Sequence, residues 1–280
     1  MIAITGSTGA VGGRVARALA GDFRNDLRLV VRDASRAPDY DTDVRVCDYA
    51  DHEAAVEALR GADLLLMVSA AEAQDRREQH RTFIRAAADA GVGHIVYTSF
   101  AGAAADATFT LGRDHWDAEQ AIRESGMTFT FLRDNFYSDL VPFFADDEGV
   151  MRGPAGDGRV AAVARADVAD VATAVLRSPA DHADATYVLT GPEALTMAEL
   201  AERAGAVLGR SLRFEDETVE AAYASRKAAY DAEDWQLDAW VSTYTAIADG
   251  SCAEVTGDVE RVAGHPARTL EEALAESMQG

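Results

Sequence analysis

Short apolar runs alternate with stretches of helical periodicity along the first 132 residues. The runs lack regular polar positions, which is typical of strands that are covered on both faces of a sheet. Strands are predicted at residues 2–5, 27–31, 44–47, 64–68, 94–98 and 128–132. Helices are predicted where apolar residues recur every three or four positions, at 13–20, 52–59, 76–90 and 115–124. The predicted fold class is therefore α/β, a doubly wound (Rossmann) parallel sheet.

The pattern changes after residue 132. Residues 133–144 are aromatic and irregular, and the glycines of residues 149–158 indicate a loop or a hairpin. Later elements are predicted as a helix at 168–176 and strands at 186–189 and 212–214. Thr196 and Glu199 have the spacing of a capping box, which begins another helix. We predict two domains: residues 1–150 as the Rossmann domain, and 151–280 as a segment that completes the sheet and forms a smaller, mostly helical lobe.

Composition and charge exclude several classes of protein. Hydrophobic residues make up 48% of the 280, enough for a large core. The chain has 26 basic and 48 acidic residues, a net charge of −22, which disfavours nucleic acids and anionic membranes as partners. Two cysteines without metal-ligand spacing fit a reducing cytoplasm. The sequence opens on a strand, not on a leader, and contains no apolar run of about 20 residues, so we expect a cytoplasmic protein.

The most specific local motif is Gly6-x-x-Gly9-x-x-Gly12, between the first predicted strand and a helix. Gly6 permits a tight turn, Gly9 lets the backbone approach a pyrophosphate, and Gly12 allows the helix to pack closely on the strand. The helix then offers free N–H groups to phosphates. This pattern predicts a dinucleotide cofactor, bound by Gly6, Ser7, Thr8, Gly9, Ala10, Val11 and Gly12.

Arg32, twenty residues beyond Gly12, ends the second predicted strand. An acidic residue at this position favours NAD, whereas an arginine suits the 2′-phosphate of NADP. Residues 1–36 contain six arginines and three aspartates, a local charge of +3 in an acidic protein. We therefore predict NADPH as the cofactor. Asp33 keeps NADH compatible with the sequence, and a solvated surface arginine is the alternative for Arg32.

Other residues follow the later predicted strands and are expected at the same edge of the sheet. Asp48 has the position of an adenine contact or of a turn aspartate, with Tyr49 beside it. Ser69 and Ala70 are expected beside the cofactor ribose, or in a simple loop. The predicted cofactor contacts are completed by Thr98 and Ser99 at the end of the fifth strand.

A typical short-chain dehydrogenase has a Tyr-x-x-x-Lys pair soon after its fifth strand. Here Leu111 occupies the tyrosine position and His115 the lysine position. Tyr223 and Lys227, the only lysine in the chain, have the correct spacing but lie far from that context. We interpret this pair as a chance match.

The sequence resembles the NmrA-like branch of atypical short-chain dehydrogenases/reductases, and within it the bacterial type-2 NAD(P)H:quinone oxidoreductases. The resemblance covers nearly the whole chain and lies in the order and spacing of its motifs. These are Met1-Ile-Ala-Ile-Thr-Gly6, Gln79-His80-Arg81, Ile95-Val96-Tyr97-Thr98-Ser99, Leu132-Arg133-Asp134-Asn135-Phe136-Tyr137, Ala155-Gly156-Asp157-Gly158, Arg165-Ala166-Asp167 and Gly264-His265-Pro266. The chain departs from the family pattern at Asp134-Asn135-Phe136, where Asn-Gly-Trp is expected.

The resemblance implies hydride transfer from NADPH to a small-molecule quinone, which we expect to be a polycyclic natural product. A quinone is a strong electrophile, so positioning supplies most of the acceleration without a tyrosine–lysine pair. Hydrogen bonds to the developing oxyanion are expected from Tyr137, Asn135 or His115. Aromatic walls for the flat ring are expected from Phe100, Phe136, Phe143 and Phe144. Ordinary inter-lobe core is the alternative for Tyr137, Phe136, Phe143 and Phe144. A helix-surface or cofactor-ribose contact is the alternative for His115.

A second hypothesis belongs to a different class of protein. Some NmrA-like proteins are catalytically idle sensors that bind NADP(H) and regulate a protein partner, and they also lack the tyrosine. A sugar-nucleotide epimerase needs the tyrosine–lysine pair and is disfavoured. The natural substrate and the oligomeric state stay open, and a homodimer is compatible with the sequence.

Overall fold

In a computed structural model, residues 1–278 of the protein are described, and they group into two compact units. Unit 1 comprises Met1–Phe100, Asp114–Arg133 and Val168–Tyr187. Unit 2 comprises Ala101–Arg113, Asp134–Asp167 and Val188–Gly280. The units interleave along the chain, whereas the predicted domains, 1–150 and 151–280, divide it with a single cut. That division remains a prediction.

The central sheet has seven strands in the order β3-β2-β1-β4-β5-β6-β9. Their bounds are Ile2–Thr5 for β1, Leu27–Val31 for β2, Asp43–Val46 for β3, Leu64–Met67 for β4, His94–Phe100 for β5, Thr128–Asp134 for β6 and Ala185–Leu189 for β9. The pairs from β3 to β5 are parallel, with Ile4 of β1 opposite Leu29 of β2 and Leu66 of β4. The strand order reverses at β1, and open α/β sheets bind their ligands at the carboxyl ends of the strands beside such a point.

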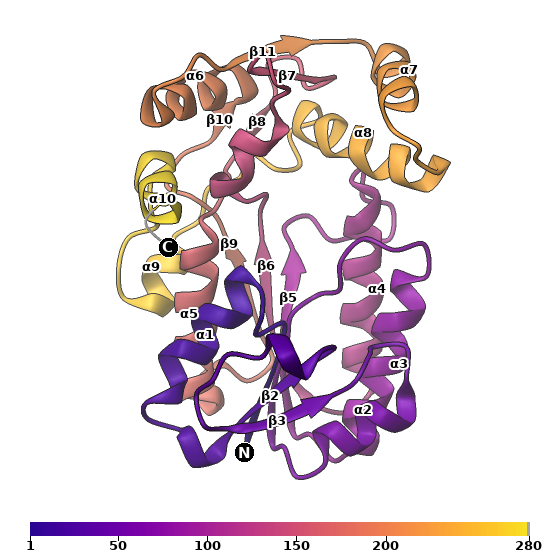
Figure 1. Ribbon diagram of the computed structural model, residues 1–280, viewed down its shortest axis with the longest axis vertical. Helices are drawn as coiled ribbons and strands as arrows, with labels where there is room; N and C mark the ends of the chain where they lie inside the picture. Colours follow the sequence, from indigo (N-terminus) through magenta and orange to yellow (C-terminus); the bar gives the residue numbers. More distant parts are fainter. Residues whose placement is uncertain (279–280) are drawn as a thin grey trace. The chain divides into compact units, whose positions relative to one another are not determined.

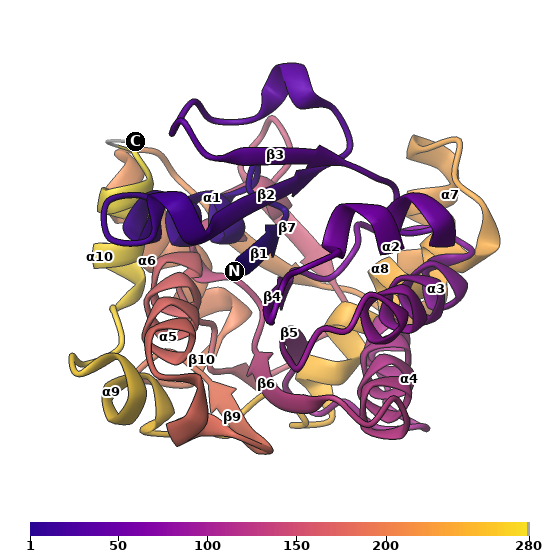
Figure 2. The ribbon, with the colours of Figure 1, turned by 90° about the horizontal axis from the view of Figure 1, so that it is seen from below.

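Helices cover both faces of this sheet, as Figures 1 and 2 show. One face carries α1 (Ala10–Ala20) and α5 (Arg165–Arg177), and the other carries α2 (His52–Leu59), α3 (Arg76–Asp89) and α4 (Thr110–Glu124). The core under α2, α3 and α4 contains Leu65, Phe83, Ile95, Ile122 and Phe131, all at most 1% exposed. The predicted doubly wound α/β class is therefore confirmed.

Unit 2 contains two small sheets and the helices that follow residue 190. Strand β7 (Val150–Gly153) pairs in parallel with β11 (Arg213–Asp216), and β8 (Arg159–Val160) pairs antiparallel with β10 (Leu195–Thr196). The 3-10 helix η3 is at Ser138–Phe144, and the helices are α6 (Met197–Leu208), α7 (Val219–Ala229), α8 (Asp234–Ala248), α9 (Asp258–Ala263) and α10 (Leu270–Ser277).

The glycine-rich segment 149–158 differs from the loop or hairpin that its composition indicates. Strand β7 lies within it and pairs with β11 rather than with its neighbour β8. Gly149 allows this pairing, because a Cβ there would lie 2.3 Å from the carbonyl oxygen of Ser211. A partner more than 60 residues away in sequence leaves no local signal, so the pattern of this segment alone does not predict the strand.

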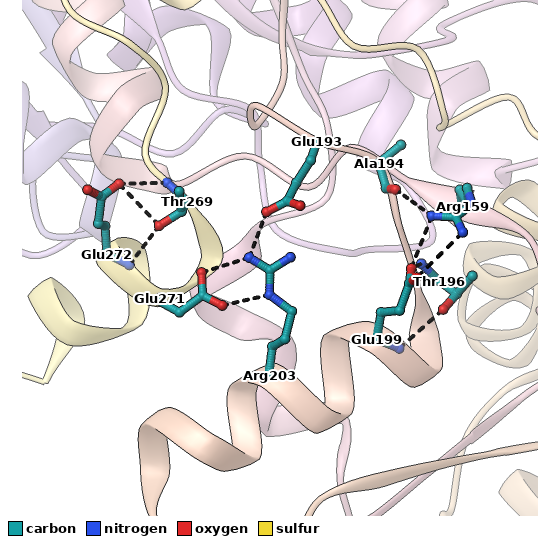
Figure 3. Close-up of polar contacts among 9 residues, drawn as sticks. All are labelled: Arg159, Glu193, Ala194, Thr196, Glu199, Arg203, Thr269, Glu271 and Glu272. Carbon is teal, nitrogen blue, oxygen red and sulfur yellow. Dashed lines mark hydrogen bonds and ion pairs between the residues drawn. The ribbon is translucent and has the colours of Figure 1, made fainter.

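The predicted capping box at the start of α6 is confirmed (Figure 3). The Thr196 hydroxyl accepts from the backbone N–H of Glu199 at 3.1 Å, and the Glu199 carboxylate accepts from the N–H of Thr196 at 2.8 Å. Further along α6, the Arg203 guanidinium donates to Glu271 of α10 at 2.6 Å and to Glu193 at 2.7 Å. These charge-assisted bonds join α6 and α10 within unit 2.

Two element ends differ from the sequence prediction for tertiary reasons. Helix α4 begins at Thr110 instead of His115, and the Thr110 N–H donates to the hydroxyl of Ser242 on α8. Strand β6 extends to Asp134, whose carbonyl accepts from the N–H of Ala101 just beyond β5. Within residues 1–278, every helix is too short or too polar to cross a membrane.

Candidate dinucleotide-binding site

The turn between β1 and α1 has the close approaches that its glycines permit. Gly6 has a φ of +64°, and a Cβ there would lie 2.9 Å from the Val68 Cβ. A Cβ on Gly12 would lie 2.5 Å from the carbonyl oxygen of Gly6 and 2.7 Å from that of Thr5. Real Cβ atoms do not come this close to backbone oxygen. The glycines at positions 6 and 12 are therefore required by the turn itself.

The amino terminus of α1 is built to face an anion. Its N-cap residue is Gly9, which has no side chain to accept a bond from the first helical N–H groups. Ser7 is 2% exposed, and its hydroxyl has no hydrogen-bond partner among residues 1–278. An orphaned buried hydroxyl beside free helix N–H groups fits the phosphates of a dinucleotide.

An open cavity of about 250 Å³ lies at this turn, entirely within unit 1. Much of its wall comes from residues that follow β1, β2, β3 and β4. Those predicted from the sequence are Gly6, Ser7, Thr8, Arg32, Asp48, Tyr49, Ser69 and Ala70. The predicted contacts Gly9, Ala10, Val11, Gly12, Thr98 and Ser99 are absent from the wall of this cavity, and their cofactor contacts remain predictions.

Sequence reasoning missed several other residues that line the cavity. Thr5, Glu72 and Gln79 are the polar ones, and Cys47 and Val68 are among the rest. Glu72 belongs to the loop between β4 and α3, and Gln79 faces the cavity from α3. A signal existed for Gln79, because it begins the Gln79-His80-Arg81 motif of the family resemblance. Burial, with the charges of Asp48 and Asp51, raises the pKa of the Cys47 thiol to about 12, so this thiol is not a nucleophile.

Arg32 and Asp33 are placed differently at the end of β2. Arg32 is exposed and lines the cavity, which is where a phosphate-binding arginine is needed. The Asp33 carboxylate instead accepts from the backbone N–H and the hydroxyl of Ser35, at 2.9 and 2.7 Å, and caps the turn Ala34–Arg36. These hydrogen bonds lower the pKa of Asp33. The carboxylate that favours NAD is thus engaged locally, while the arginine faces the cavity.

Hydroxyl groups tie the strand ends together beneath the cavity. The Tyr49 hydroxyl donates to the carbonyl of Val68 at 2.7 Å, and its ring stacks on Phe83 at 4.1 Å. Burial raises the pKa of Tyr49. The Thr98 hydroxyl accepts from the N–H of Ser69 at 2.8 Å. Tyr49 and Thr98 therefore hold the residues that follow β4, Val68 and Ser69, in place at the cavity.

Ser99 and His115 are held by neighbours within unit 1. The Ser99 hydroxyl donates to the fully buried carboxylate of Glu119 at 2.7 Å, and Arg133 neutralises this carboxylate with bonds of 2.8 and 2.7 Å. His115 is 7% exposed and lies 3.0 Å from both the Tyr97 hydroxyl and an Arg76 nitrogen. Burial, followed by the charge of Arg76, holds the pKa of His115 well below its usual range, so the imidazole is neutral.

Asn135 and Tyr137 lie in unit 2 and also use their polar atoms internally. The Asn135 amide donates to the carbonyl of Cys252 at 2.9 Å. The Tyr137 hydroxyl donates to the Asp134 carboxylate at 2.6 Å, and burial with that charge raises the pKa of Tyr137 well above its usual value. The catalytic roles of Asn135, Tyr137 and His115 remain predictions.

The four phenylalanines expected around an acceptor have different surroundings. Phe100 is buried in unit 1, with its ring centroid 6.2 Å from that of His115. Phe136 packs edge-on against Phe109 at 5.1 Å in unit 2. Phe143 is 78% exposed and Phe144 38% exposed. These two aromatic side chains of η3 do not form the ordinary core that was the alternative for them.

Tyr223 and Lys227 lie on α7 in unit 2. The Tyr223 hydroxyl donates to Asp238 at 2.8 Å, and desolvation together with this carboxylate raises the pKa of the tyrosine. A catalytic tyrosine needs a lowered pKa. The ammonium of Lys227 lies 4.0 Å from Asp234, and its side chain is 73% exposed.

The fold and this cavity define a dinucleotide-binding protein of the doubly wound α/β class, with an arginine where NADP-binding members carry one. The NmrA-like family model matches residues 1–237, and the chain belongs to the NmrA-like family. It is 32% identical to quinone oxidoreductase 2 of Escherichia coli, covering 98% of both chains. It is 36% identical to (4-alkanoyl-5-oxo-2,5-dihydrofuran-3-yl)methyl phosphate reductase of Streptomyces griseus, covering 99% of this chain and 97% of that one.

A solved structure of the same family has the same fold over its whole length. The Escherichia coli NADPH-dependent quinone oxidoreductase complexed with NADPH superimposes with a TM-score of 0.88 at 31% identity. The match covers 99% of this chain and 100% of that chain. The predicted family resemblance is confirmed.

Gly12 and Gly9 should respond differently to an added methyl group. Gly12→Ala places a Cβ 2.5 Å from a backbone oxygen that cannot rotate away, and we expect the free energy of unfolding to fall by more than about 2 kcal/mol. Gly9→Ala meets its nearest atom at 3.4 Å, so we expect a loss of no more than about 1 kcal/mol, the difference between the residues at an N-cap. Urea denaturation without cofactor measures both, and equal losses would contradict this account of the turn.

Proposed function

We propose that the protein is an NADPH-dependent oxidoreductase that transfers a hydride to a quinone, with a polycyclic natural-product quinone as the acceptor class. The single observation that carries the cofactor assignment is the cavity at the β1–α1 turn, whose wall includes the exposed Arg32 and Ser7, a residue with a buried hydroxyl that has no hydrogen-bond partner among residues 1–278. A quinone as the acceptor is supported by the quinone oxidoreductase relatives, and its polycyclic class belongs to the proposal alone.

The chain's own residues bind and orient the cofactor in this proposal. Backbone N–H groups at the start of α1 and the Ser7 hydroxyl hold the pyrophosphate, and Arg32 holds the 2′-phosphate. Asp48 contacts the adenine ring of the cofactor, and Ser69 and Ala70 lie beside a cofactor ribose. When bound, NADPH supplies a hydride equivalent from its nicotinamide ring.

The proposed reaction proceeds without a Tyr-Lys catalytic pair. Tyr223 has a raised pKa and donates its proton to a carboxylate, which is the opposite of an activated acid. Tyr137 and Asn135 are likewise engaged in hydrogen bonds with neighbouring groups. A simple ketone needs a strong proton donor for its alkoxide, whereas a quinone gains aromaticity on reduction and forms a much weaker base. Orientation of an electrophilic acceptor therefore suffices for most of the acceleration.

The proposed function is tested by NADPH consumption with a panel of acceptors. We expect the wild-type protein to bind NADPH and to turn over quinones, polycyclic ones with the highest kcat/KM. A butenolide phosphate in the panel tests the activity named for the Streptomyces griseus relative. NADPH binding without turnover of any acceptor would favour the idle redox sensor, and no binding of NADPH would overturn the proposal altogether.

Arg32→Ala should weaken NADPH binding about tenfold or more and leave NADH binding nearly unchanged. A charge-assisted contact to a partly exposed phosphate is worth roughly 1.5–3 kcal/mol, and NADH lacks that phosphate. Arg45→Ala is the matched control, because it also removes one positive charge from unit 1 but lies outside the wall of the cavity. Titration of both cofactors by fluorescence gives the dissociation constants. Equal losses for NADPH and NADH would contradict the role of Arg32.

Two substitutions at Tyr137 separate the contribution of its ring to quinone turnover from that of its hydroxyl. Because the hydroxyl already donates to Asp134, we expect Tyr137→Phe to keep quinone turnover within about twofold of wild type. Tyr137→Ala also removes the aromatic face, which is worth about 0.5–1.5 kcal/mol in stacking, and should lower kcat/KM for quinone while sparing NADPH affinity. Tyr223→Ala is the control, since Tyr223 also donates to a carboxylate, and it should leave quinone kinetics intact. Normal kinetics with a lowered melting temperature in Tyr137→Ala would make Tyr137 ordinary core.

A further inference from the structure

Buried polar side chains hold the loop that forms one wall of the dinucleotide cavity. We propose that Arg76 and His80 of α3 are positioning residues for the cofactor, because together they fix the Ala70 peptide at the end of β4. This inference rests on the proposed function, since it concerns the same cofactor site. It assigns a role to side chains that lie outside the wall of the cavity itself.

Both polar groups of the Ala70 backbone are held from within unit 1. The Ala70 N–H donates to His80 Nε2 at 2.9 Å, and the Ala70 carbonyl accepts from Arg76 Nε at 2.9 Å. His80 is 0% exposed and Arg76 is 3% exposed, so neither is a solvated surface residue. A loop residue with both backbone groups bound to buried side chains has little freedom to move.

The hydrogen-bond donors fix the protonation of both histidines. His80 Nε2 accepts from Ala70, so its single proton is on Nδ1, which lies 3.5 Å from the Tyr97 hydroxyl. His115 Nε2 accepts from Arg76 Nη2, so its proton is also on Nδ1, 3.0 Å from the same hydroxyl. Each ring must stay neutral to keep these bonds. Burial and the charge of Arg76 lower the pKa of both, in agreement with this arrangement.

The cation that holds the loop is itself balanced within the same unit. Arg76 Nη1 lies 3.6 Å from the carboxylate of Asp114, which is nearly buried and also accepts from Arg77 at 2.5 Å. The side chain of Arg77 is 52% exposed. Asp114 therefore supports two neighbouring arginines, of which Arg76 is the one that bonds to Ala70.

The fixed peptide is separate from the part of the site that reads the 2′-phosphate. Ala70 follows β4 and Arg32 follows β2, and β1 lies between these strands in the sheet. Ala70 also lines the cavity with its neighbour Ser69. Loss of the loop position should thus weaken NADPH and NADH alike, whereas loss of Arg32 weakens NADPH selectively.

The test measures dissociation constants for NADPH and NADH well below the melting temperature of each variant. Arg76→Met and His80→Leu remove the bonds to Ala70, and we expect each to weaken both cofactors by about fivefold to tenfold and in equal ratio. His80→Gln offers an acceptor oxygen in place of Nε2 and should restore both affinities to within about twofold of wild type. The value of kcat with both substrates saturating should change less than the KM for NADPH.

Arg77→Met is the matched control for Arg76→Met. It removes the neighbouring arginine from the same aspartate but no bond to Ala70, so both affinities should stay at the wild-type level. Arg76→Lys keeps the charge beside Asp114 but cannot bond to Ala70 and His115 in the same geometry. It replaces Arg76→Met if that variant does not fold, and the same weakening is expected.

The outcomes separate this inference from the proposed function. If the wild-type protein binds neither cofactor, the proposed function fails. If wild type binds NADPH and the Arg76 and His80 variants bind it equally well, with only lower melting temperatures, these residues are purely structural and the inference is wrong. Selective loss of NADPH alone, or failure of His80→Gln to restore binding, would also overturn it.

Discussion

The turn from β1 into α1 works only because no side-chain atom occupies the space between Gly12 and the carbonyl oxygens of Thr5 and Gly6. With a Cβ at that position the first turn of α1 would move away from the strand. Gly6, Ser7 and Thr8 of this turn line the cavity together with the residues that follow β2 and β4. This steric constraint thus determines how closely α1 packs on β1 beside the cavity.

Around this turn, most buried polar side chains are committed to the protein itself. Tyr49 and Thr98 hold β4, Ser99 is bound by Glu119, and His80 with Arg76 holds Ala70. A buried polar group without a hydrogen-bond partner lowers the stability of the fold, so a stable fold is expected to satisfy most of its buried polar side chains internally. Ser7 is an exception in the cavity wall, and an orphaned hydroxyl there is better explained by a ligand than by the apo protein.

Two tyrosine hydroxyls donate hydrogen bonds to carboxylates, and this limits their ability to protonate a substrate. Tyr137 and Tyr223 donate to Asp134 and Asp238, and each has a raised pKa. Such residues are poor acids, which supports the proposal of an acceptor that needs little protonation to accept a hydride. Quinones meet that requirement, because aromatisation drives their reduction.

The sequence by itself determined the α/β class, the glycine turn, the capping box of α6 and the arginine at the end of β2, because each of these depends on residues close together in the chain. Glycine spacing, apolar periodicity and cap residues act through local backbone geometry. Only the tertiary structure decided that β7 pairs with β11, that α4 begins at Thr110, that Asp33 caps its own turn while Arg32 lines the cavity, and that His80 and Arg76 bind Ala70. Most of these outcomes depend on which atoms meet across long sequence separations, and even the local choice of Asp33 depends on a side-chain orientation that residue spacing does not encode.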